Sequence, residues 1–244
     1  MSQFSRTELI FGRHALEKLF NSRVAVFGIG GVGGFVVEAL ARSGVGTLDL
    51  FDDDKVALSN LNRQIIATHK TIGRYKVDVA KERILEINPN ARVNTYKLFY
   101  LPETADQIDL SVYDYVVDAI DTISAKIELI HRCKALGVPI ISSMGAGNKI
   151  NATGFEVADI YETSVCPMAK VLRHELKARK IDSLKVVYSK EKPKVPNISP
   201  EMLAAENAAR NSSRRQIPGS TSYVPATVGL IIAGEVIKDL TGIR

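Results

Sequence analysis

The sequence predicts an α/β protein with a doubly wound, mostly parallel sheet. Short continuous apolar runs alternate along the first 150 residues with longer segments whose apolar residues recur at helical spacing. A cluster of glycines, GIGGVG at residues 28–33, separates the first apolar run from the first helical segment. Strands that alternate with helices in this way form parallel sheets covered by helices on both faces. With 244 residues, of which 45% are hydrophobic and 24% charged, the chain is long enough to bury a core.

The first predicted unit is strand, helix, strand. Val24–Phe27 is the continuous apolar run expected of a parallel strand that is buried on both faces. Val32–Leu40 carries apolar residues at helical spacing, and Gly44 and Gly46 mark the end of that helix. Thr47–Phe51 supplies the second strand, and the crossover between the two strands should be right-handed.

The alternation continues to residue 143. We expect a helix at Gly73–Ile87 and strands at Val93–Phe99 and Tyr115–Ala119. A helix at Ile123–Leu136 and a strand at Pro139–Ser143 follow. The first of these helices ends before a proline, which disfavours helical geometry in the residue that precedes it.

The pattern changes after residue 147. Phe155–Ile160 is expected to be a strand that joins the sheet differently, and Ala169–Lys180 is expected to be a helix. Residues 189–222 are polar and contain four prolines, which indicates a long crossover or lid segment with some helix. Pro225–Leu240 is an apolar helix expected to pack on the sheet.

These elements predict one domain. It would span residues 1–244 as a Rossmann-like sheet, with a basic helix and crossover segment, residues 161–222, inserted before the C-terminal helix.

The positive charge of the chain is concentrated in one region. The net charge is +5, but residues 170–194 contain nine Lys or Arg against three acids and sum to +6. Lys170, Arg173, Lys177 and Lys180 recur at spacings of three and four, which makes a basic stripe on the predicted helix. Such a patch is typical of a protein that binds a phosphate-rich partner, although a solvated helix face would give the same pattern.

Composition excludes several classes of protein. No apolar run reaches the roughly 18 residues of a membrane-spanning helix, and the N-terminus lacks the features of a signal peptide. The two cysteines are far apart, so they cannot form a disulfide framework or a four-cysteine zinc site. We expect a cytoplasmic protein that does not associate with a membrane.

The glycine cluster predicts a nucleotide site. Gly28, Gly30 and Gly33 satisfy the GxGxxG pattern between a strand and a helix, and Gly31 adds a fourth glycine. Glycines let backbone N–H groups at a helix N-terminus approach a phosphate or ribose closely. The alternative is tight packing of strand on helix with no ligand.

An acidic cluster follows the second strand. Asp52 lies 19 residues after Gly33, at the position where a carboxylate accepts hydrogen bonds from ribose hydroxyls. The sequence does not exclude Asp54 for that role. At this point a nicotinamide-dependent dehydrogenase fits as well as any other nucleotide-binding protein.

The stretch SNLNRQ, residues 59–64, favours ATP. A triphosphate needs side-chain donors and cations for its outer phosphates, and Asn60, Arg63 and Gln64 supply donors. Lys76 adds a point charge at the start of the next helix. The alternative is an asparagine-rich loop that caps a helix.

Asp121 is the candidate magnesium ligand. It follows the strand that contains Asp118, at the edge of the sheet where ligands bind. A carboxylate that faces a triphosphate is tolerated when Mg²⁺ lies between them. The alternative is that Asp121 caps the helix that follows.

Five motifs resemble, in their order, those of the ubiquitin-activating-enzyme-like superfamily of adenylating enzymes. They are GxGGxG, D-x-D, S-N-L-x-R-Q, G-x-x-K and D-x-x-D. The resemblance covers residues 4–150 and, more loosely, the last helix. It implies that Gly31 lies against ATP, that Asp52 binds the ribose and that Asp121 positions Mg²⁺. It also implies that phosphates are held by Asn60, Arg63 and Lys76, with Gln64 beside them.

The resemblance further implies a homodimer. The segment FSR looks like the superfamily's N-terminal segment, whose arginine, Arg6 here, reaches the phosphates bound by the partner subunit. The residues that the superfamily pattern assigns to catalysis are Arg63, Lys76 and Asp121.

The cysteines do not match the superfamily's activators of sulfur-carrier proteins. Those enzymes usually carry two CxxC pairs and a catalytic cysteine in the crossover segment, whereas this chain has neither. Cys133 lies on an apolar helix and is expected to be buried, and Cys166 is expected to be exposed. The departure argues against thioester or persulfide chemistry on this chain.

Nearly the whole chain resembles another branch, the tRNA threonylcarbamoyladenosine dehydratases. The likeness is carried by SRTELIFG, by RQIIATHKTIGRYKVDVAKERILEINP, by SMGAGNKINATGFEVADI and by TSYVPATVGLIIAGEVIK. It implies ATP-dependent cyclisation of threonylcarbamoyladenosine beside the anticodon of tRNA, with the stripe Lys170, Arg173 and Lys177 holding the tRNA backbone.

Other functions remain as alternatives. The main one is an adenylating activator of a small sulfur-carrier or ubiquitin-like protein that uses an external thiol. Such chemistry would add a cysteine desulfurase or a sulfur acceptor as a partner. A catalytically silent tRNA- or nucleotide-binding module and a nicotinamide dehydrogenase are the others.

Overall fold

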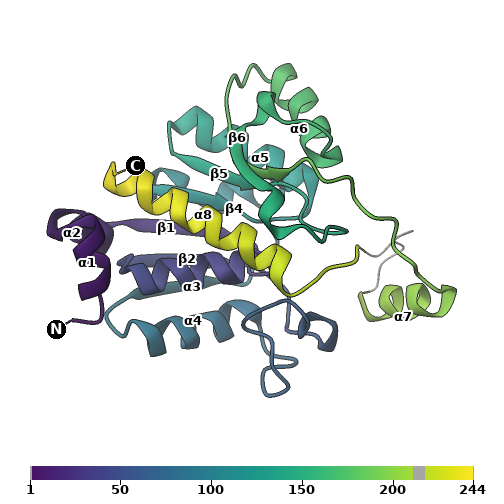
Figure 1. Cartoon of the computed structure of the whole chain (residues 1–244), viewed down its shortest axis with the longest axis horizontal. Coiled ribbons are helices and arrows are strands. Elements are labelled where there is room, and N and C mark those ends of the chain that lie inside the picture. Colours follow the sequence, from purple (N-terminus) through teal and green to yellow (C-terminus); the bar gives the residue numbers. More distant parts are fainter. Residues whose placement is uncertain (1, 211–217, 244) are drawn as a thin grey trace.

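A single mixed sheet forms the centre of the protein. The computed structural model describes residues 2–210 and 218–243. Within them the sheet has seven strands: β1 (Arg23–Phe27), β2 (Thr47–Phe51), β3 (Arg92–Tyr96), β4 (Tyr115–Asp118), β5 (Ile140–Ser143), β6 (Phe155–Asp159) and β7 (Lys185–Ser189). Figure 1 shows the sheet with helices in front of it and behind it.

The strand order places a crevice at the ends of β1 and β4. The order is β3-β2-β1-β4-β5-β7-β6, and every neighbouring pair is parallel except β6 with β7. The chain runs outward from β1 through β2 and β3, then returns to the other side of β1 as β4. Ligands bind at such a reversal, outside the carboxyl ends of the strands. The predicted doubly wound fold is confirmed.

Alternating strand residues build two cores. Val24 and Val26 face a cluster formed with α3 (Gly33–Ser43), α4 (Lys76–Ile87) and α8 (Tyr223–Thr241). Ala25 and Phe27 face the other cluster, formed with α5 (Ile123–Leu136) and α6 (Pro167–Ala178). Because both faces of the sheet are covered, the central strands are apolar throughout.

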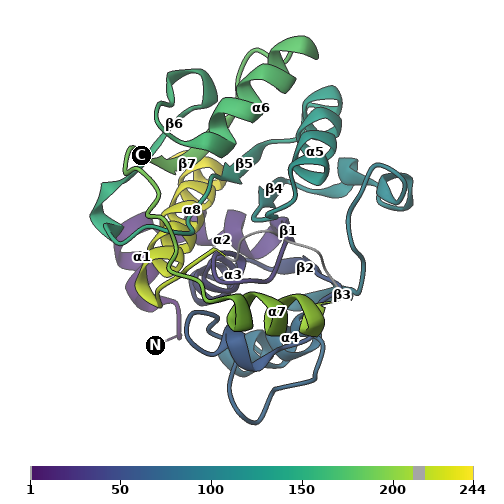
Figure 2. The ribbon, with the colours of Figure 1, turned by 90° about the vertical axis from the view of Figure 1, so that its right-hand side faces the viewer.

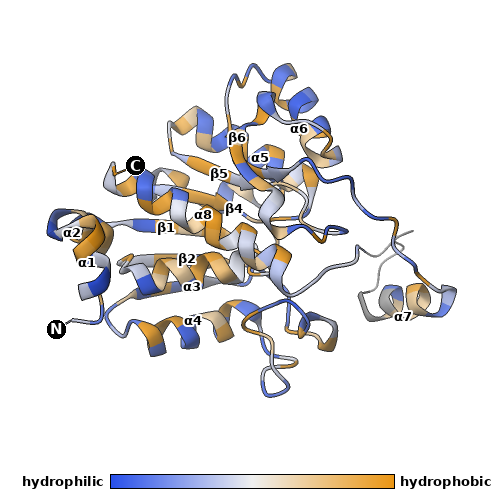
Figure 3. Cartoon of the chain, viewed as in Figure 1, coloured by the Kyte–Doolittle hydropathy of each residue, from blue (hydrophilic) through white to orange (hydrophobic). Residues whose placement is uncertain are grey.

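Helix α8 lies directly on α3 in the front layer, and Figure 3 shows it as one of the most hydrophobic helices. A Cβ atom on Gly229 would lie 2.4 Å from the carbonyl oxygen of Val32, so the two helices approach as closely as only glycine allows. Val228 and Ile232 of α8 are fully buried. The C-terminal helix thus packs on the sheet as predicted. It is longer than the predicted range, Pro225–Leu240, by two residues at its start and by one at its end.

Three elements were not predicted from the sequence. Helices α1 (Ser5–Phe11) and α2 (Arg13–Asn21) precede β1, and Phe4 packs edge-on against Phe20 to hold them together. Strand β7 lies inside the basic region, where the four residues between Lys185 and Lys190 gave little signal. It is nevertheless central, because it joins β5 to the antiparallel edge strand β6.

Several predicted boundaries were wrong by a few residues. Strand β3 ends at Tyr96 rather than at residue 99, and α4 begins at Lys76 rather than at residue 73. Helix α6 spans Pro167–Ala178, so Lys180 lies outside it with a left-handed backbone. Each error falls at an end of an element, where loop contacts decide the backbone.

The polar segment before α8 contains one helix, α7 (Pro200–Arg210). Figure 1 shows α7 standing apart from the sheet, on the side where α8 begins, and Figure 2 views the protein from that side, with α7 in front. Part of the predicted crossover, residues 211–217, lies outside the described residues. In the described ranges, none of the helices has the length and apolarity needed to cross a membrane.

A buried carboxylate joins α3 to α4. Glu38 accepts hydrogen bonds from Arg42 at 2.8 Å and from Arg83 at 2.6 Å. Burial by itself would raise the pKa of Glu38, but the two arginines outweigh it and lower that pKa below its ordinary value.

We therefore predict that Glu38 stabilises the fold in a pH-dependent way. A lowered carboxyl pKa contributes stability above the unfolded value, 4.5, and that contribution is lost as the pH falls through the folded value. Glu38→Gln should lower the free energy of unfolding at pH 7 by about 1 kcal/mol, because both arginines are partly exposed. Urea unfolding should show a smaller difference from wild type at pH 4. Glu86→Gln, an exposed change on α4, is the control; an equal loss in both variants would contradict the prediction.

Candidate nucleotide-binding site

The glycine turn between β1 and α3 closes on itself. Gly28 has a φ of +89°, and a Cβ atom there would lie 2.7 Å from the carbonyl oxygen of Ala119. A Cβ atom on Gly33 would lie 1.8 Å from the carbonyl oxygen of Gly28. These two glycines are required by packing. Gly30 is different, because the nearest atom to its Cβ position is Nε2 of Gln64 at 4.0 Å. The open face of the turn is therefore at Gly30.

Gly31 is held by packing on both sides. Its Cβ position lies 3.2 Å from Cβ of Pro225 on α8 and 3.5 Å from Cγ of Arg63. The turn thus brings together the start of α8 and the stem of the arginine from SNLNRQ.

Asp52 ties the second strand to the glycine turn. Its Oδ2 accepts a hydrogen bond from the backbone N–H of Ile29 at 2.7 Å, and its Oδ1 accepts one from the N–H of Asp54 at 2.9 Å. Burial raises the pKa of Asp52, although the charge of Lys76 and both backbone hydrogen bonds act in the opposite direction. The carboxylate of Asp52, rather than that of Asp54, lies against the turn.

Lys76 lies with these acids. It is the first residue of α4 and only 5% exposed. Its Nζ is 2.6 Å from Oδ2 of Asp54 and 3.5 Å from Oδ1 of Asp52. The carboxylates of Asp52, Asp53 and Asp54 also come within 4.8 Å of one another, a second place where a cation would fit. The ammonium group of Lys76 contacts two of these carboxylates, and its single positive charge offsets one of the three negative charges.

The stretch at residues 59–64 forms a tight turn beside the glycines. Asn60 is buried, and its Oδ1 accepts a hydrogen bond from the N–H of Ala57 at 3.0 Å. Nη1 of Arg63 donates to the carbonyl oxygen of Ser59 at 2.8 Å and to Oδ1 of Asn62 at 2.9 Å. The alternative that this loop caps a helix is therefore correct for Oδ1 of Asn60, which caps the short helical turn at residues 58–60. The Nδ2 donor of Asn60 takes no part in this cap.

Gln64 carries an unsatisfied acceptor. The residue is 6% exposed, and among the described residues its buried Oε1 has no hydrogen-bond partner. A buried amide oxygen without a partner costs on the order of 1–3 kcal/mol. Because the Gln64 amide lies beside the open face at Gly30, a bound ligand that offers a donor would remove this cost.

Asp121 lies at the end of the neighbouring strand. Asp118, the last residue of β4, is paired in register with Phe27, the last residue of β1, so the loop that follows β4 emerges beside the glycine turn. Asp121 is exposed and accepts a hydrogen bond from the hydroxyl of Thr122 at 3.4 Å. The N-cap of α5 is Thr122, so the alternative role of Asp121 as the cap is wrong.

A buried network beneath this loop was missed in the sequence. Lys126 of α5 is fully buried, and its Nζ donates to Oδ2 of Asp118 at 2.9 Å, to the hydroxyl of Ser142 at 3.2 Å and to the carbonyl oxygen of Ser143 at 2.8 Å. All three ammonium protons are used, which makes burial of the charge tolerable. A lysine on the apolar face of a predicted helix was the signal that would have found it.

Arg6 is not brought to this site within one chain. It lies on α1, which with α2 precedes the amino end of β1, whereas the glycine turn follows the carboxyl end. Figure 1 shows α1 at the end of the sheet away from α7.

The basic stripe lies on α6, which covers the other face of the sheet. Lys170 and Lys177 are exposed. Arg173 instead turns inward, and its Nη1 donates to the carbonyl oxygen and the hydroxyl of Thr163. Arg173 is therefore only partly exposed within the predicted stripe, because Thr163 offers this guanidinium two acceptors.

Both cysteines are buried. Cys133 is fully buried, as predicted, and burial raises the pKa of its thiol to about 12. Cys166 was expected to be exposed but is only 2% exposed, because it lies at the start of α6 with its side chain in the core. Neither thiol is presented for nucleophilic chemistry.

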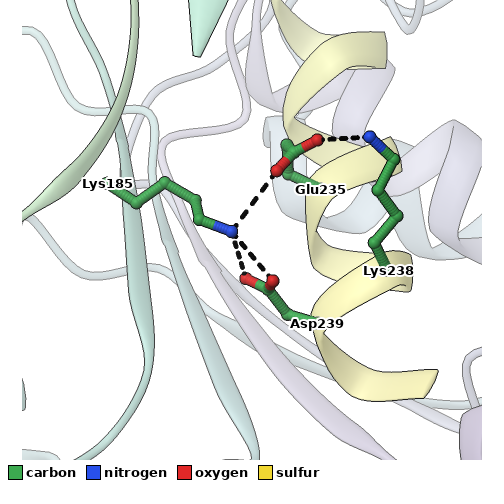
Figure 4. A pocket seen from close by; sticks show the side chains of 4 residues that line it. All are labelled: Lys185, Glu235, Lys238 and Asp239. Atoms are coloured by element: carbon green, nitrogen blue, oxygen red, sulfur yellow. Dashed lines mark hydrogen bonds and ion pairs between the residues drawn. The ribbon is translucent and has the colours of Figure 1, made fainter. Parts of the chain in front are cut away.

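A second polar hollow, of about 310 Å³, lies far from the glycine turn. Figure 4 shows Lys185 of β7 reaching Glu235 and Asp239 on α8, with Lys238 paired to Glu235. Lys185 is the first residue of its strand, so this hollow is at the amino end of the sheet. Its two cations and two anions neutralise each other, and we assign no ligand to it.

The different roles of the glycines give a prediction. Gly30→Ala places a methyl group on the open face and should leave the melting temperature unchanged within about 2 °C, while weakening ATP binding at least about tenfold. Gly33→Ala collides with the backbone and should destabilise the fold by more than about 3 kcal/mol. Calorimetric titration and thermal melts check both variants. Wild-type ATP binding by Gly30→Ala would place the nucleotide elsewhere.

The comparisons with known proteins agree with this geometry. The chain is 45% identical to a tRNA threonylcarbamoyladenosine dehydratase from Bacillus subtilis (strain 168), over 98% of this chain and 95% of that protein. It is 33% identical to the enzyme of that name from Escherichia coli (strain K12), over 98% and 93%. The structure of the Escherichia coli dehydratase in complex with ATP matches with a TM-score of 0.86 and 32% identity, covering 98% of this chain and 94% of that one. Residues 4–244 match the ThiF family. With the glycine turn, Asp52 and the SNLNRQ stretch assembled at one crevice, the chain belongs to the ThiF family.

Proposed function

We propose that this chain is an ATP-dependent tRNA threonylcarbamoyladenosine dehydratase. The observation that carries the proposal is the likeness to enzymes of that name along almost the entire chain, insert and C-terminal helix included. The geometry supports it, because the glycine turn, Asp52, Lys76 and SNLNRQ meet where a nucleotide binds in such sheets.

Each group in the crevice takes one part of ATP. The carboxylate of Asp52 accepts hydrogen bonds from the ribose, and the face of Gly30 lies against the phosphates. Arg63, Lys76 and the amides of Asn60 and Gln64 hold the outer phosphates. The space over Gly30, with Nε2 of Gln64 as the nearest donor beside it, supports this placement. The unpartnered Oε1 of Gln64 is an acceptor and is left for a donor such as a ribose hydroxyl.

Asp121 is the proposed magnesium ligand. Its carboxylate is exposed at the carboxyl end of β4, next to the strand that leads into the glycine turn, and carboxylate oxygens suit Mg²⁺. When bound there, Mg²⁺ would reduce the repulsion between Asp121 and the triphosphate. The network of Asp118, Lys126 and Ser142 fixes the backbone that carries Asp121.

The reaction needs positioning more than a protein nucleophile. A carboxylate oxygen of the threonyl group attacks the α-phosphorus of ATP, pyrophosphate leaves, and a mixed anhydride with AMP forms. The neighbouring carbamoyl group then attacks the activated carbonyl carbon and loses a proton, and AMP leaves with the carboxylate oxygen. This second step is intramolecular and therefore has a high effective molarity. Two buried thiols fit a mechanism without a thioester.

The tRNA is proposed to lie against α6. Lys170 and Lys177 present exposed ammonium groups that contact phosphates without reading sequence. Arg173 contributes by fixing the loop at Thr163 and by its charge. The modified base must be unstacked to reach the nucleotide, as is usual for recognition of RNA.

Further parts of the proposal concern assembly and location. The position of Arg6 at the far end of the sheet fits a homodimer in which this arginine reaches the partner subunit's nucleotide. We also propose a cytoplasmic location, and a cysteine desulfurase or sulfur acceptor as a further partner.

Mass spectrometry of nucleosides tests the reaction and the role of Asp121. Full-length chain incubated with ATP, Mg²⁺ and tRNA that carries threonylcarbamoyladenosine should convert the nucleoside to a product lighter by one water. Asp121→Asn should reduce turnover at least about a hundredfold with an unchanged melting temperature, because the neutral amide is a weaker magnesium ligand. Asp182→Asn, the same exposed change outside the site, is the control. Pyrophosphate exchange that requires a small carrier protein instead of tRNA would refute the proposal, and full activity of Asp121→Asn would refute its role.

The two exposed lysines of α6 give a second prediction. Lys170→Glu with Lys177→Glu should weaken tRNA binding at least about tenfold at 100 mM salt and leave ATP binding within about twofold. The salt dependence of tRNA binding should become shallower by roughly two phosphate contacts. Filter binding at several salt concentrations measures both. Lys134→Glu with Lys238→Glu, two lysines outside α6, is the control. Equal losses in both double variants would mean that α6 is not the tRNA surface.

A further inference from the structure

Asn148 joins the two ends of the segment that connects β7 to α8. Its backbone N–H donates to the carbonyl oxygen of Gly219 at 2.8 Å, and its Oδ1 accepts from the N–H of Gly219 at 2.6 Å. Its carbonyl oxygen accepts from the N–H of Lys194 at 2.7 Å. One residue therefore holds the chain both where it leaves the sheet and where it returns.

The backbone of Asn148 is adapted to this role. Its φ is +60°, in the left-handed region that asparagine adopts more readily than most residues. The preceding Gly147 lets Pro218 come close, since a Cβ atom there would lie 3.2 Å from Cβ of Pro218. The SMGAGNK stretch supplies both residues: Gly147 makes room for Pro218, and Asn148 bonds Gly219.

A second asparagine joins the returning chain to the phosphate-binding loop. Nδ2 of Asn62 donates to the carbonyl oxygen of Ser220 at 3.1 Å, and Oδ1 of the same side chain accepts from Nη1 of Arg63 at 2.9 Å. Ser220 follows Gly219 directly. A continuous path therefore runs from Lys194 to Arg63. Hydrogen bonds join Lys194 to Asn148 and Asn148 to Gly219, and the chain continues to Ser220. Hydrogen bonds then join Ser220 to Asn62 and Asn62 to Arg63.

The outer end of this path is cationic and exposed. Lys192 and Lys194 are exposed on the chain that leaves β7, which Figure 3 shows as hydrophilic. Glu191 holds the start of that chain by accepting from the N–H groups of Ile150 and Asn151. A polyanion bound at these lysines would act on backbone that is already bonded to Asn148.

We propose that Asn62 and Asn148 are positioning residues that couple tRNA binding at this cationic chain to the placement of Arg63 on the phosphates of ATP. The inference rests on the proposed function, because it takes tRNA as the polyanion. Binding of tRNA should tighten ATP binding, and by thermodynamic reciprocity ATP should tighten tRNA binding by the same factor. The coupling ensures that the site is fully assembled for ATP when the RNA substrate is present.

The test measures the affinity of the full-length chain for a non-hydrolysable ATP analogue, with and without saturating tRNA. The tRNA is an unmodified transcript, which has the phosphate backbone but no carboxylate to react. Wild type should bind the analogue at least about fivefold more tightly with tRNA. Asn62→Asp keeps the acceptor for Arg63 and loses the donor to Ser220, so this factor should fall below about twofold.

Asn148→Gly should have the same effect. Glycine keeps the left-handed backbone and the bonds of the main chain but removes the acceptor for Gly219. Since the two residues act in series, the double variant should lose no more coupling than either single variant. The control is Asn21→Asp on α2, which makes the same change of charge as Asn62→Asp at an exposed side chain that donates to the carbonyl oxygen of Glu17.

The outcomes separate the relay from the proposed function. If wild type binds tRNA but shows no coupling, or if Asn62→Asp and Asn148→Gly keep the wild-type factor, the relay is wrong and the proposed function stands. If Asn21→Asp loses the coupling as well, the effect is one of charge and the relay is again wrong. If wild type neither binds tRNA nor converts threonylcarbamoyladenosine, the proposed function and the relay fail together.

Discussion

The structure depends on the close approach of backbone to backbone at the glycine turn. Gly33 has no room for a side chain against the carbonyl oxygen of Gly28, and Gly28 has none against Ala119 of the neighbouring strand end. These contacts draw the ends of β1 and β4 together and set the start of α3 over them. The N–H of Ile29 in the turn then bonds Asp52, which fixes the end of β2 to the same point. Every other part of the site is placed relative to these three strand ends.

Electrostatics at the crevice is balanced in pairs. Lys76 is buried beside Asp52 and also pairs with the exposed Asp54, and Lys126 is buried with Asp118 and two oxygen atoms of β5. Removing one partner of such a pair leaves a buried charge, which is costly, so these groups keep the loops at the strand ends in one arrangement. The groups proposed to face ATP and Mg²⁺, namely Arg63, Gln64 and Asp121, are carried by those loops. Rigid support beneath a few polar side chains is the arrangement that a reaction based on positioning requires.

The inserted region and the nucleotide site are physically connected rather than merely adjacent in sequence. Helix α8 packs on α3 through Gly229, and Pro225 at its start packs on Gly31. The chain that enters α8 is held by Asn148 and Asn62. A segment that carries exposed lysines is thereby anchored to the loop that presents Arg63, and this connection is the basis of the proposed coupling.

The sequence by itself determined the sheet class and the chemistry of the crevice. Short segments of four or five residues between turns predicted β1, β2 and β5, and helical spacing predicted α3. GIGGVG with Asp52 predicted a nucleotide at the turn, because these signals are local. Strand β7 was missed because five residues among lysines become a strand only when β5 and β6 offer edges to pair with. The burial of Cys166, the inward turn of Arg173 and the bonds of Asn148 also depended on residues distant in sequence. Tertiary structure alone decided them, since a side chain's exposure and partners are set by what the fold brings beside it.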